Sequence, residues 1–208
     1  MNWEDKDYVL RLIKEFGRFL RALRDAADDQ ARQLLLDIQC RTACGMGLRA
    51  VDGMDDESLR ELTTDEARLS LAMLLSARAE VLAKNDDERE RWQGKALRLM
   101  LAFQDDGMVC RELAETADGL MRGAFDRLTA EELYGCACFF RSGGRVDLMD
   151  NAVFFLWETL PDRALWLDRL LALYEELSDE TLAACGLSRA DRDESLTRLR
   201  DEMGGCFR

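Results

Sequence analysis

The 208-residue chain has no histidine. This excludes Ser-His-Asp and Cys-His hydrolase sites, HExxH metalloproteases and zinc sites that mix cysteine with histidine. Histidine is also the commonest acid–base group at neutral pH, so catalysis here would need carboxylates, lysine, cysteine or a metal. We find no such constellation assembled in the sequence and predict a protein that is not an enzyme and holds no cofactor.

Proline is almost absent as well, with Pro161 the single example. Because helix interiors reject proline, a chain with one proline can be helical nearly throughout. Valine, isoleucine and threonine are scarce, and no alternating strand pattern stands between hairpin turns. The sequence therefore predicts an all-α protein.

Long apolar runs and positive charge are also lacking. No window approaches the 18 apolar residues of a membrane span, and the N-terminal MNWEDKDYVLRLIKEF does not read as a secretory signal. The net charge of −13 argues against nucleic acid as a partner. Seven cysteines without a secretory context are typical of reduced thiols. We expect a cytoplasmic protein that binds neither nucleic acid nor membrane.

A broad apolar stripe marks the first predicted helix, Glu4–Arg24. The stripe looks wider than one neighbouring helix can cover. Ordinary core packing would explain much of it, and contact with a membrane surface is a further alternative. We single out Leu10, Phe16 and Phe19 as a possible subunit interface. The same segment carries six Lys/Arg against four Asp/Glu, in contrast to the acidic remainder of the chain.

Helical periodicity continues along the whole chain. Further helices are predicted over about 28–44, 57–62, 63–84, 86–104, 109–121, 130–141, 146–159, 161–177 and 188–203, with one more turn after Ser178. Thr63–Glu66 and Thr129–Glu132 fit capping boxes that open two of them. Nine or ten helices with short connections must pack as antiparallel pairs, which form a bundle or a solenoid.

One helix pair, Ala130–Pro161, resembles a tetratricopeptide repeat. Leu133, Cys136-Ala137 and Phe140 have the large-small-aromatic spacing of the repeat's first helix, the turn GGRVD follows, and the closing proline is in place. Met149 departs from the pattern, because it stands in place of the small alanine that lets the second helix of the pair approach the first. A weaker match covers about Ala67–Phe103.

Most of the chain also resembles an uncharacterised family of small helical proteins from Gram-positive bacteria, a domain of unknown function. The matching segments are DYVLRLIKEFGRFL, GGRVDLMDNAVFFLWETLPD and LYEELSDETLAACGLSRADRDESLTRLR. The resemblance implies a tetratricopeptide-like right-handed superhelix or short α-solenoid. It supplies no catalytic residues.

In tetratricopeptide arrays the first helix of each pair lines the concave binding face. If Ala130–Pro161 follows that pattern, Tyr134, Cys138 and Arg141 project there and could grip the carboxylates or backbone of a peptide. The alternative is that all three are surface or inter-helix residues.

Two kinds of metal site are conceivable. Cys40 and Cys44 lie one helical turn apart and could share a metal with Cys136 and Cys138, although cysteine also packs as a small buried residue. The acidic clusters 25–29, 55–57 and 86–90 could hold Mg²⁺, but they stand at predicted helix starts, where capping explains them. We predict no metal.

Together these observations predict one helical-repeat domain over 1–208. It comprises N-terminal helices (1–62), tetratricopeptide-like pairs (63–161) and C-terminal helices (162–208). The preferred function is a non-enzymatic module that binds a protein or peptide, or associates with itself as a homo-oligomer. The alternatives are a sensor that encloses a small molecule or peptide, and a carboxylate- or metal-dependent enzyme.

Overall fold

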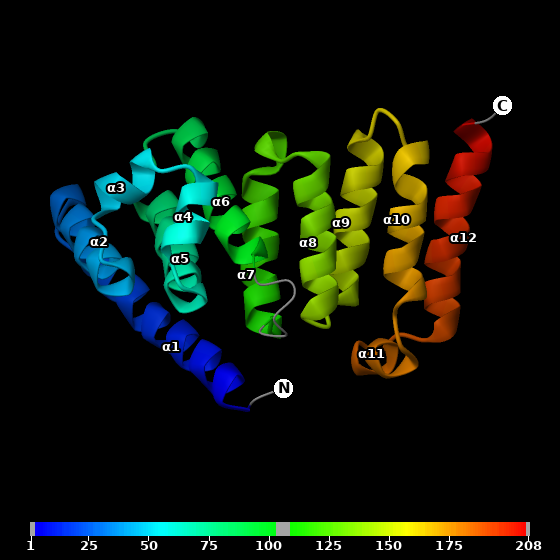
Figure 1. Ribbon diagram of the computed structural model, residues 1–208, viewed down its shortest axis with the longest axis horizontal. Helices are drawn as coiled ribbons and strands as arrows, with labels where there is room; N and C mark the ends of the chain where they lie inside the picture. The colour runs from blue at the N-terminus through cyan, green and yellow to red at the C-terminus, as the bar shows by residue number, and fades with distance from the viewer. Residues whose placement is uncertain (1–2, 103–108, 207–208) are drawn as a thin grey trace. The chain divides into compact units, whose positions relative to one another are not determined.

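The chain is all-helical in a computed structural model, which describes residues 3–102 and 109–206, with side chains over 9–102 and 109–201 (Figure 1). These residues form no strand and fold into twelve α-helices and one 3₁₀ turn, Phe125–Arg127. The helices are α1 Trp3–Asp25, α2 Asp29–Cys44, α3 Leu48–Gly53, α4 Asp56–Leu62, α5 Asp65–Val81, α6 Asp86–Leu101, α7 Arg111–Gly123, α8 Ala130–Ser142, α9 Val146–Thr159, α10 Ala164–Glu175, α11 Asp179–Ala184 and α12 Arg189–Cys206. The all-α prediction is confirmed.

Short polar side chains begin the helices, as the sequence predicts. The Asp28, Asp55 and Asn85 side chains each accept a backbone N–H from the first turn of the helix that follows. The predicted capping box at Thr129 is present in full. Asp28 and Asp55 of the acidic clusters therefore have a capping role, and the acids at 86–88 lie in the first turn of α6 behind the Asn85 cap.

The predicted capping box at Thr63 is wrong by one residue. Thr64 caps α5 by accepting from the Ala67 N–H, and Ala67 cannot return the second bond that a glutamate would make. Thr63 is buried, and its hydroxyl donates to the Leu59 carbonyl oxygen. The two adjacent threonines are equivalent in sequence, and burial of the first decides between them.

Contacts divide the chain into two compact units. The first lies within Met1–Met108 and Thr116–Leu128, and the second comprises Val109–Glu115 and Thr129–Arg208. In the first unit α5 is the central helix, since nine of its residues are buried. It packs against α6, α2 and α1.

The short helix α3 is the one helix that the sequence did not predict. It begins after Gly47 without a side-chain cap and spans six residues, so local propensity gives little signal. Tertiary contacts hold it instead. Leu48 and Val51 are buried, and Lys95 of α6 donates to the carbonyl oxygens of Val51 (2.7 Å) and Met54 at its C-terminal end.

In the second unit, α8 and α9 pack as an antiparallel pair. The turn between them has Gly144 in the left-handed region (φ +66°), which favours glycine, so the predicted tight turn is confirmed. Met149 is fully buried, so its longer side chain is part of the core of this unit. α10 begins at Ala164, three residues after Pro161, so proline ends α9 but is not in the first turn of the next helix.

The arrangement of these pairs as a tetratricopeptide-like superhelix stays a prediction, as does the single domain over 1–208. Among the described helices, none has both the length and the apolar character that crossing a bilayer requires.

Candidate functional site

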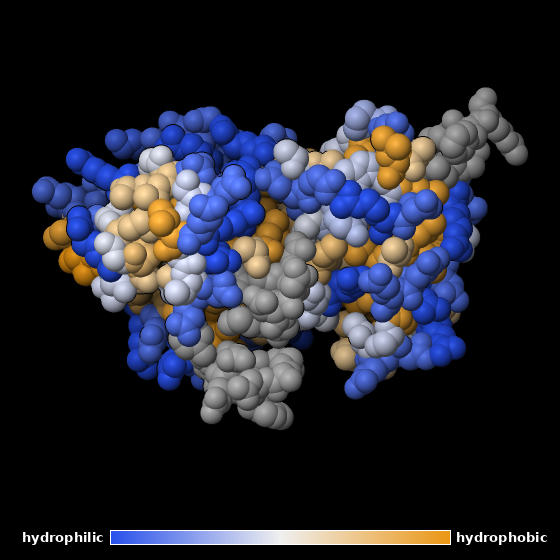
Figure 2. Space-filling view, viewed as in Figure 1, coloured by the Kyte–Doolittle hydropathy of each residue, from blue (hydrophilic) through white to orange (hydrophobic). Residues whose placement is uncertain are grey.

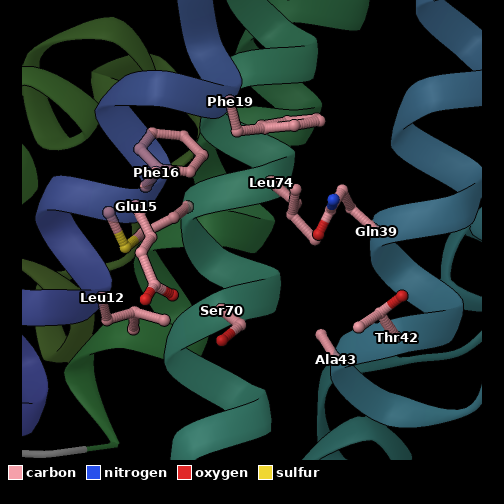
Figure 3. A pocket seen from close by; sticks show the side chains of 10 residues that line it. Leu12, Glu15, Phe16, Phe19, Gln39, Thr42, Ala43, Ser70 and Leu74 are labelled. Carbon is pink, nitrogen blue, oxygen red and sulfur yellow. The ribbon is translucent and has the colours of Figure 1, made fainter.

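An open groove of about 300 Å³ lies in the first unit between α1, α2 and α5 (Figure 3). Its lining is mainly apolar and comprises Leu12, Glu15, Phe16, Phe19, Gln39, Thr42, Ala43, Ser70, Met73 and Leu74. We call this the α1–α2–α5 groove. It contains two of the aromatic residues that the sequence singled out.

The groove exists because α1 has a wider apolar stripe than its neighbours cover. Val9 and Leu23 fix the helix to the unit and are completely buried. Phe16 and Phe19 lie on the same face but stay partly exposed. Their ring centroids are 6.2 Å apart, within the range of favourable aromatic pairs. The two rings therefore give α1 an aromatic wall that faces the groove.

The hydroxyl groups in the groove are satisfied by their own helices. Ser70 Oγ donates to the carbonyl oxygen of Glu66 (2.9 Å), and Thr42 Oγ1 donates to that of Ile38 (2.9 Å). Of the residues that line the groove, Glu15 alone is ionisable. Such a lining can hold apolar groups but offers no nucleophile and no acid–base pair.

Apolar surface continues from the groove along α2. Leu34 is 60% exposed and Ile38 is 48% exposed. The two residues are one helical turn apart, and Ile38 is one turn from Thr42, which lines the groove. Figure 2 shows this hydrophobic surface over α2, at the left of the view. Together with the groove it forms a surface larger than a scattered apolar residue would explain.

The opposite flank of α1 is basic. Lys14, Arg18 and Arg21 are exposed and recur at helical spacing. Among the residues with described side chains, Lys14 and Arg18 form no ion pair. A chain of net charge −13 therefore presents free positive charge on α1, on the flank away from the groove.

The three residues predicted for a subunit interface do not all lie at the same site. Phe16 and Phe19 come together and line the groove. Leu10 is 38% exposed and lies outside it. The prediction of an interface itself stays a prediction. The sequence did not identify the contributions of α2 and α5, because they follow from which helices pack together.

Tyr134, Cys138 and Arg141 lie on one face of α8, as predicted, but α10 packs on that face. The Tyr134 and Trp166 rings are 5.9 Å apart. The Arg169 guanidinium lies 4.1 Å from the centre of the Tyr134 ring and 4.3 Å from that of Trp166. The chain's own helix therefore covers these residues.

Electrostatics agree with this covered position. Burial raises the pKa of the Cys138 thiol and that of the Tyr134 hydroxyl, so both stay protonated at neutral pH. Arg141 forms an ion pair with Glu176 at the end of α10. All three residues therefore contact or lie beside α10, and a peptide-binding role for them stays a prediction.

Cys40 and Cys44, considered above as metal ligands, are held by burial and by a bond to the backbone. Cys40 is fully buried, and burial raises the pKa of its thiol to about 12, far from the thiolate that binds metals. Cys44 Sγ donates to the Cys40 carbonyl oxygen (3.1 Å). Over the part of the chain that the structure describes, no three Cys, Asp or Glu residues are grouped as a metal site would require.

Comparison of the chain with protein-family models, curated proteins and solved structures gives no significant match. The family resemblance drawn from the sequence therefore stays a prediction.

Proposed function

We propose that the protein is a non-enzymatic interaction module whose first unit binds an acidic, amphipathic helical segment of another protein in the α1–α2–α5 groove. One observation carries the proposal: Phe16 and Phe19 are partly exposed in an apolar groove whose other side is already formed by α2 and α5. Aromatic residues in a preformed groove are the usual anchors of protein interfaces.

The size and shape of the surface suit a helix. About 300 Å³ accommodates roughly ten non-hydrogen atoms at about 30 Å³ each, or one or two large side chains. Leu34 and Ile38 extend the apolar surface along the axis of α2. An amphipathic helix places apolar anchors three and four residues apart on one face, so it would fill the groove and reach this extension.

The distribution of charge on the protein indicates the charge of the partner. Lys14, Arg18 and Arg21 lie on the flank of α1 that points away from the groove residues, whereas the chain as a whole is strongly acidic. An acidic partner would be attracted to α1 and repelled elsewhere, which directs it to the helix that forms one side of the groove. Because the net charge of the chain is −13, we infer that nucleic acid is not the partner.

The test is selection of peptides from a random 16-residue display library, followed by fluorescence anisotropy on the enriched sequences. We expect enriched peptides with two large apolar residues three or four positions apart and net negative charge. Phe19→Ser should weaken their binding about 10- to 100-fold, since burial of an aromatic side chain contributes roughly 1.5–3 kcal/mol. Lys14→Glu with Arg18→Glu should weaken it further at low salt.

Leu165→Ser is the matched control, because Leu165 is 74% exposed on α10 and belongs to the second unit. It should leave peptide affinity unchanged, and circular dichroism checks that each variant is folded. Enriched peptides that bind Phe19→Ser as well as the unchanged protein would contradict the proposal. So would self-association that depends on Phe16 and Phe19, because the occupant would then be a second copy.

We keep a small-molecule sensor as the second candidate function. It is favoured by a separate, more enclosed cavity within the second unit. The two functions concern different residues and do not depend on each other.

A further inference from the structure

The second unit has a cavity of about 170 Å³ between α9, α10, α11 and α12. Its walls are part apolar and part polar, and it is lined by Val146, Asp147, Asp150, Tyr174, Leu177, Leu182, Cys185, Leu187, Asp191, Arg192 and Ser195. Convergence of a few polar groups in a small apolar cavity is typical of a site for a small ligand. We call it the α9–α12 cavity.

Asp150 is the centre of the polar part. Its Oδ1 accepts a hydrogen bond from the Tyr174 hydroxyl (2.5 Å) and another from Ser195 Oγ (3.2 Å). Burial, followed by the nearby Asp150 charge, raises the pKa of Tyr174, so the hydroxyl remains a donor. Both donors are neutral, so they orient the carboxylate but do not neutralise it.

The other charged groups at the cavity have partners of their own. Asp147 pairs with Arg145 (2.6 Å), and Arg192 pairs with Asp193 (3.1 Å). Within residues 9–102 and 109–201, no lysine or arginine forms an ion pair with Asp150. A carboxylate charge beside apolar walls is costly unless a cation is close to it. Asp150 is therefore the one cavity carboxylate oriented by hydroxyls and open to a cationic ligand.

The third carboxylate of the cavity is also occupied. Asp191 accepts from the backbone N–H of Ser188 (2.7 Å) and from its hydroxyl (2.6 Å), and these bonds form the cap of α12. This carboxylate therefore serves its own helix, and the cavity has a single open anionic point.

The apolar walls limit what can accompany a cation. Val146, Leu177, Leu182 and Leu187 surround the remaining space. At about 30 Å³ for each water-sized group, 170 Å³ holds roughly five or six non-hydrogen atoms. A short alkyl chain with one charged nitrogen has this size and this division into apolar and cationic parts.

We propose that the α9–α12 cavity binds a small primary alkylammonium ion. Its ammonium group donates to Asp150, and its alkyl chain packs against Leu182 of α11 and against Leu177 and Leu187, which precede and follow that helix. An ammonium has three donors and no acceptor, which matches a carboxylate that already holds two hydroxyls. The site is independent of the α1–α2–α5 groove.

The probe is n-butylammonium, compared with 1-butanol and butyrate, which have the same number of carbon atoms with a neutral or a negative end. Millimolar n-butylammonium should raise the melting temperature of the protein, because a ligand that binds only the folded state stabilises it. Saturation-transfer NMR should show contact with its methyl end. Butanol and butyrate should have at most a tenth of this affinity.

Asp150→Asn keeps the shape of the side chain and removes its charge, so butylammonium binding should fall at least about tenfold. Asp168→Asn is the control, because Asp168 is exposed on α10 and outside the cavity. Leu187→Phe fills the cavity but keeps Asp150, and it should also abolish binding.

Equal responses to butylammonium, butanol and butyrate in the unchanged protein would overturn the proposal, and so would the absence of any response to butylammonium. This comparison of three probes uses only the unchanged protein, so it tests the proposal even if Asp150→Asn fails to fold. Binding that survives both Asp150→Asn and Leu187→Phe would place the ligand elsewhere and equally overturn the assignment.

Discussion

Each unit of the molecule has a pair of neighbouring aromatic rings near its surface, and the two pairs differ in what covers them. Phe16 and Phe19 of the first unit line an open groove. Tyr134 and Trp166 of the second unit are similarly spaced, but Arg169 lies over both rings and forms two hydrogen bonds with Glu131. An aromatic face becomes a binding surface only where the chain itself leaves it uncovered.

The largest effect should come from an aromatic residue that no solvent reaches. Phe140 is fully buried in the second unit, and Phe140→Ala should lower the free energy of unfolding by about 3–5 kcal/mol. Urea unfolding measures this loss, with Leu165→Ala as an exposed control. A loss below about 1 kcal/mol would contradict the assignment of Phe140 to the core.

Tyr174 gives the next largest effect and a dependence on pH. Tyr174→Phe removes a hydrogen bond to a carboxylate and should cost about 1.5–3 kcal/mol at pH 7. Because burial raises the pKa of Tyr174, the unfolded chain releases this proton first as pH rises above about 10. This group then lowers the free energy of unfolding by about 1.4 kcal/mol per pH unit.

The measurement is urea unfolding of both proteins between pH 9 and pH 11. The unchanged protein should lose stability more steeply than Tyr174→Phe, and the difference between the two slopes isolates Tyr174 from the cysteines and other tyrosine residues. Parallel slopes would show that the hydroxyl is not protected in the folded state.

Removal of a groove aromatic should cost much less than removal of a buried one. Phe19→Ser should lower the free energy of unfolding by about 1 kcal/mol, because a partly exposed ring gives up only part of the transfer energy of a buried one. Thermal and urea unfolding of Phe19→Ser and Phe140→Ala, measured side by side, test which variant loses more stability. A loss as large as that of Phe140→Ala would mean that the ring belongs to the core and not to a binding surface.

The smallest effect on stability should come from uncovering the second aromatic pair. The Arg169 side chain is 41% exposed, so Arg169→Gln should cost about 0.2–1 kcal/mol. It should nevertheless increase the binding of a hydrophobic dye such as anilinonaphthalene sulfonate to the second unit. No gain in dye fluorescence would show that Arg169 is not what closes this face.

Much of the fold could be predicted from local sequence. The long helices and most of their ends follow from apolar periodicity, glycines and capping residues, as at Thr129 and Gly144. α3 could not be predicted in this way, because Lys95 and two buried side chains hold it from outside the segment. The same holds for Thr63, which is buried although its neighbour Thr64 caps α5.

The site was less predictable than the fold. The stripe on α1 identified Phe16 and Phe19, because an apolar face wider than its neighbours leaves part of itself exposed. Tyr134 is covered by Arg169 and Trp166 of α10. Local sequence could not predict this, because it does not show that α10 packs against α8. The α9–α12 cavity had no sequence signal at all, since its residues come from four helices.

The bond from Lys95 to the end of α3 also implies an order of events during synthesis. A six-residue helix is too short to persist alone in water. The amine that holds its last carbonyl groups comes from a residue 44 positions after Val51. Until Lys95 has left the ribosome, these carbonyl groups therefore lack the amine, and α3 is supported by α2 alone, where Asp37 accepts the Leu48 N–H.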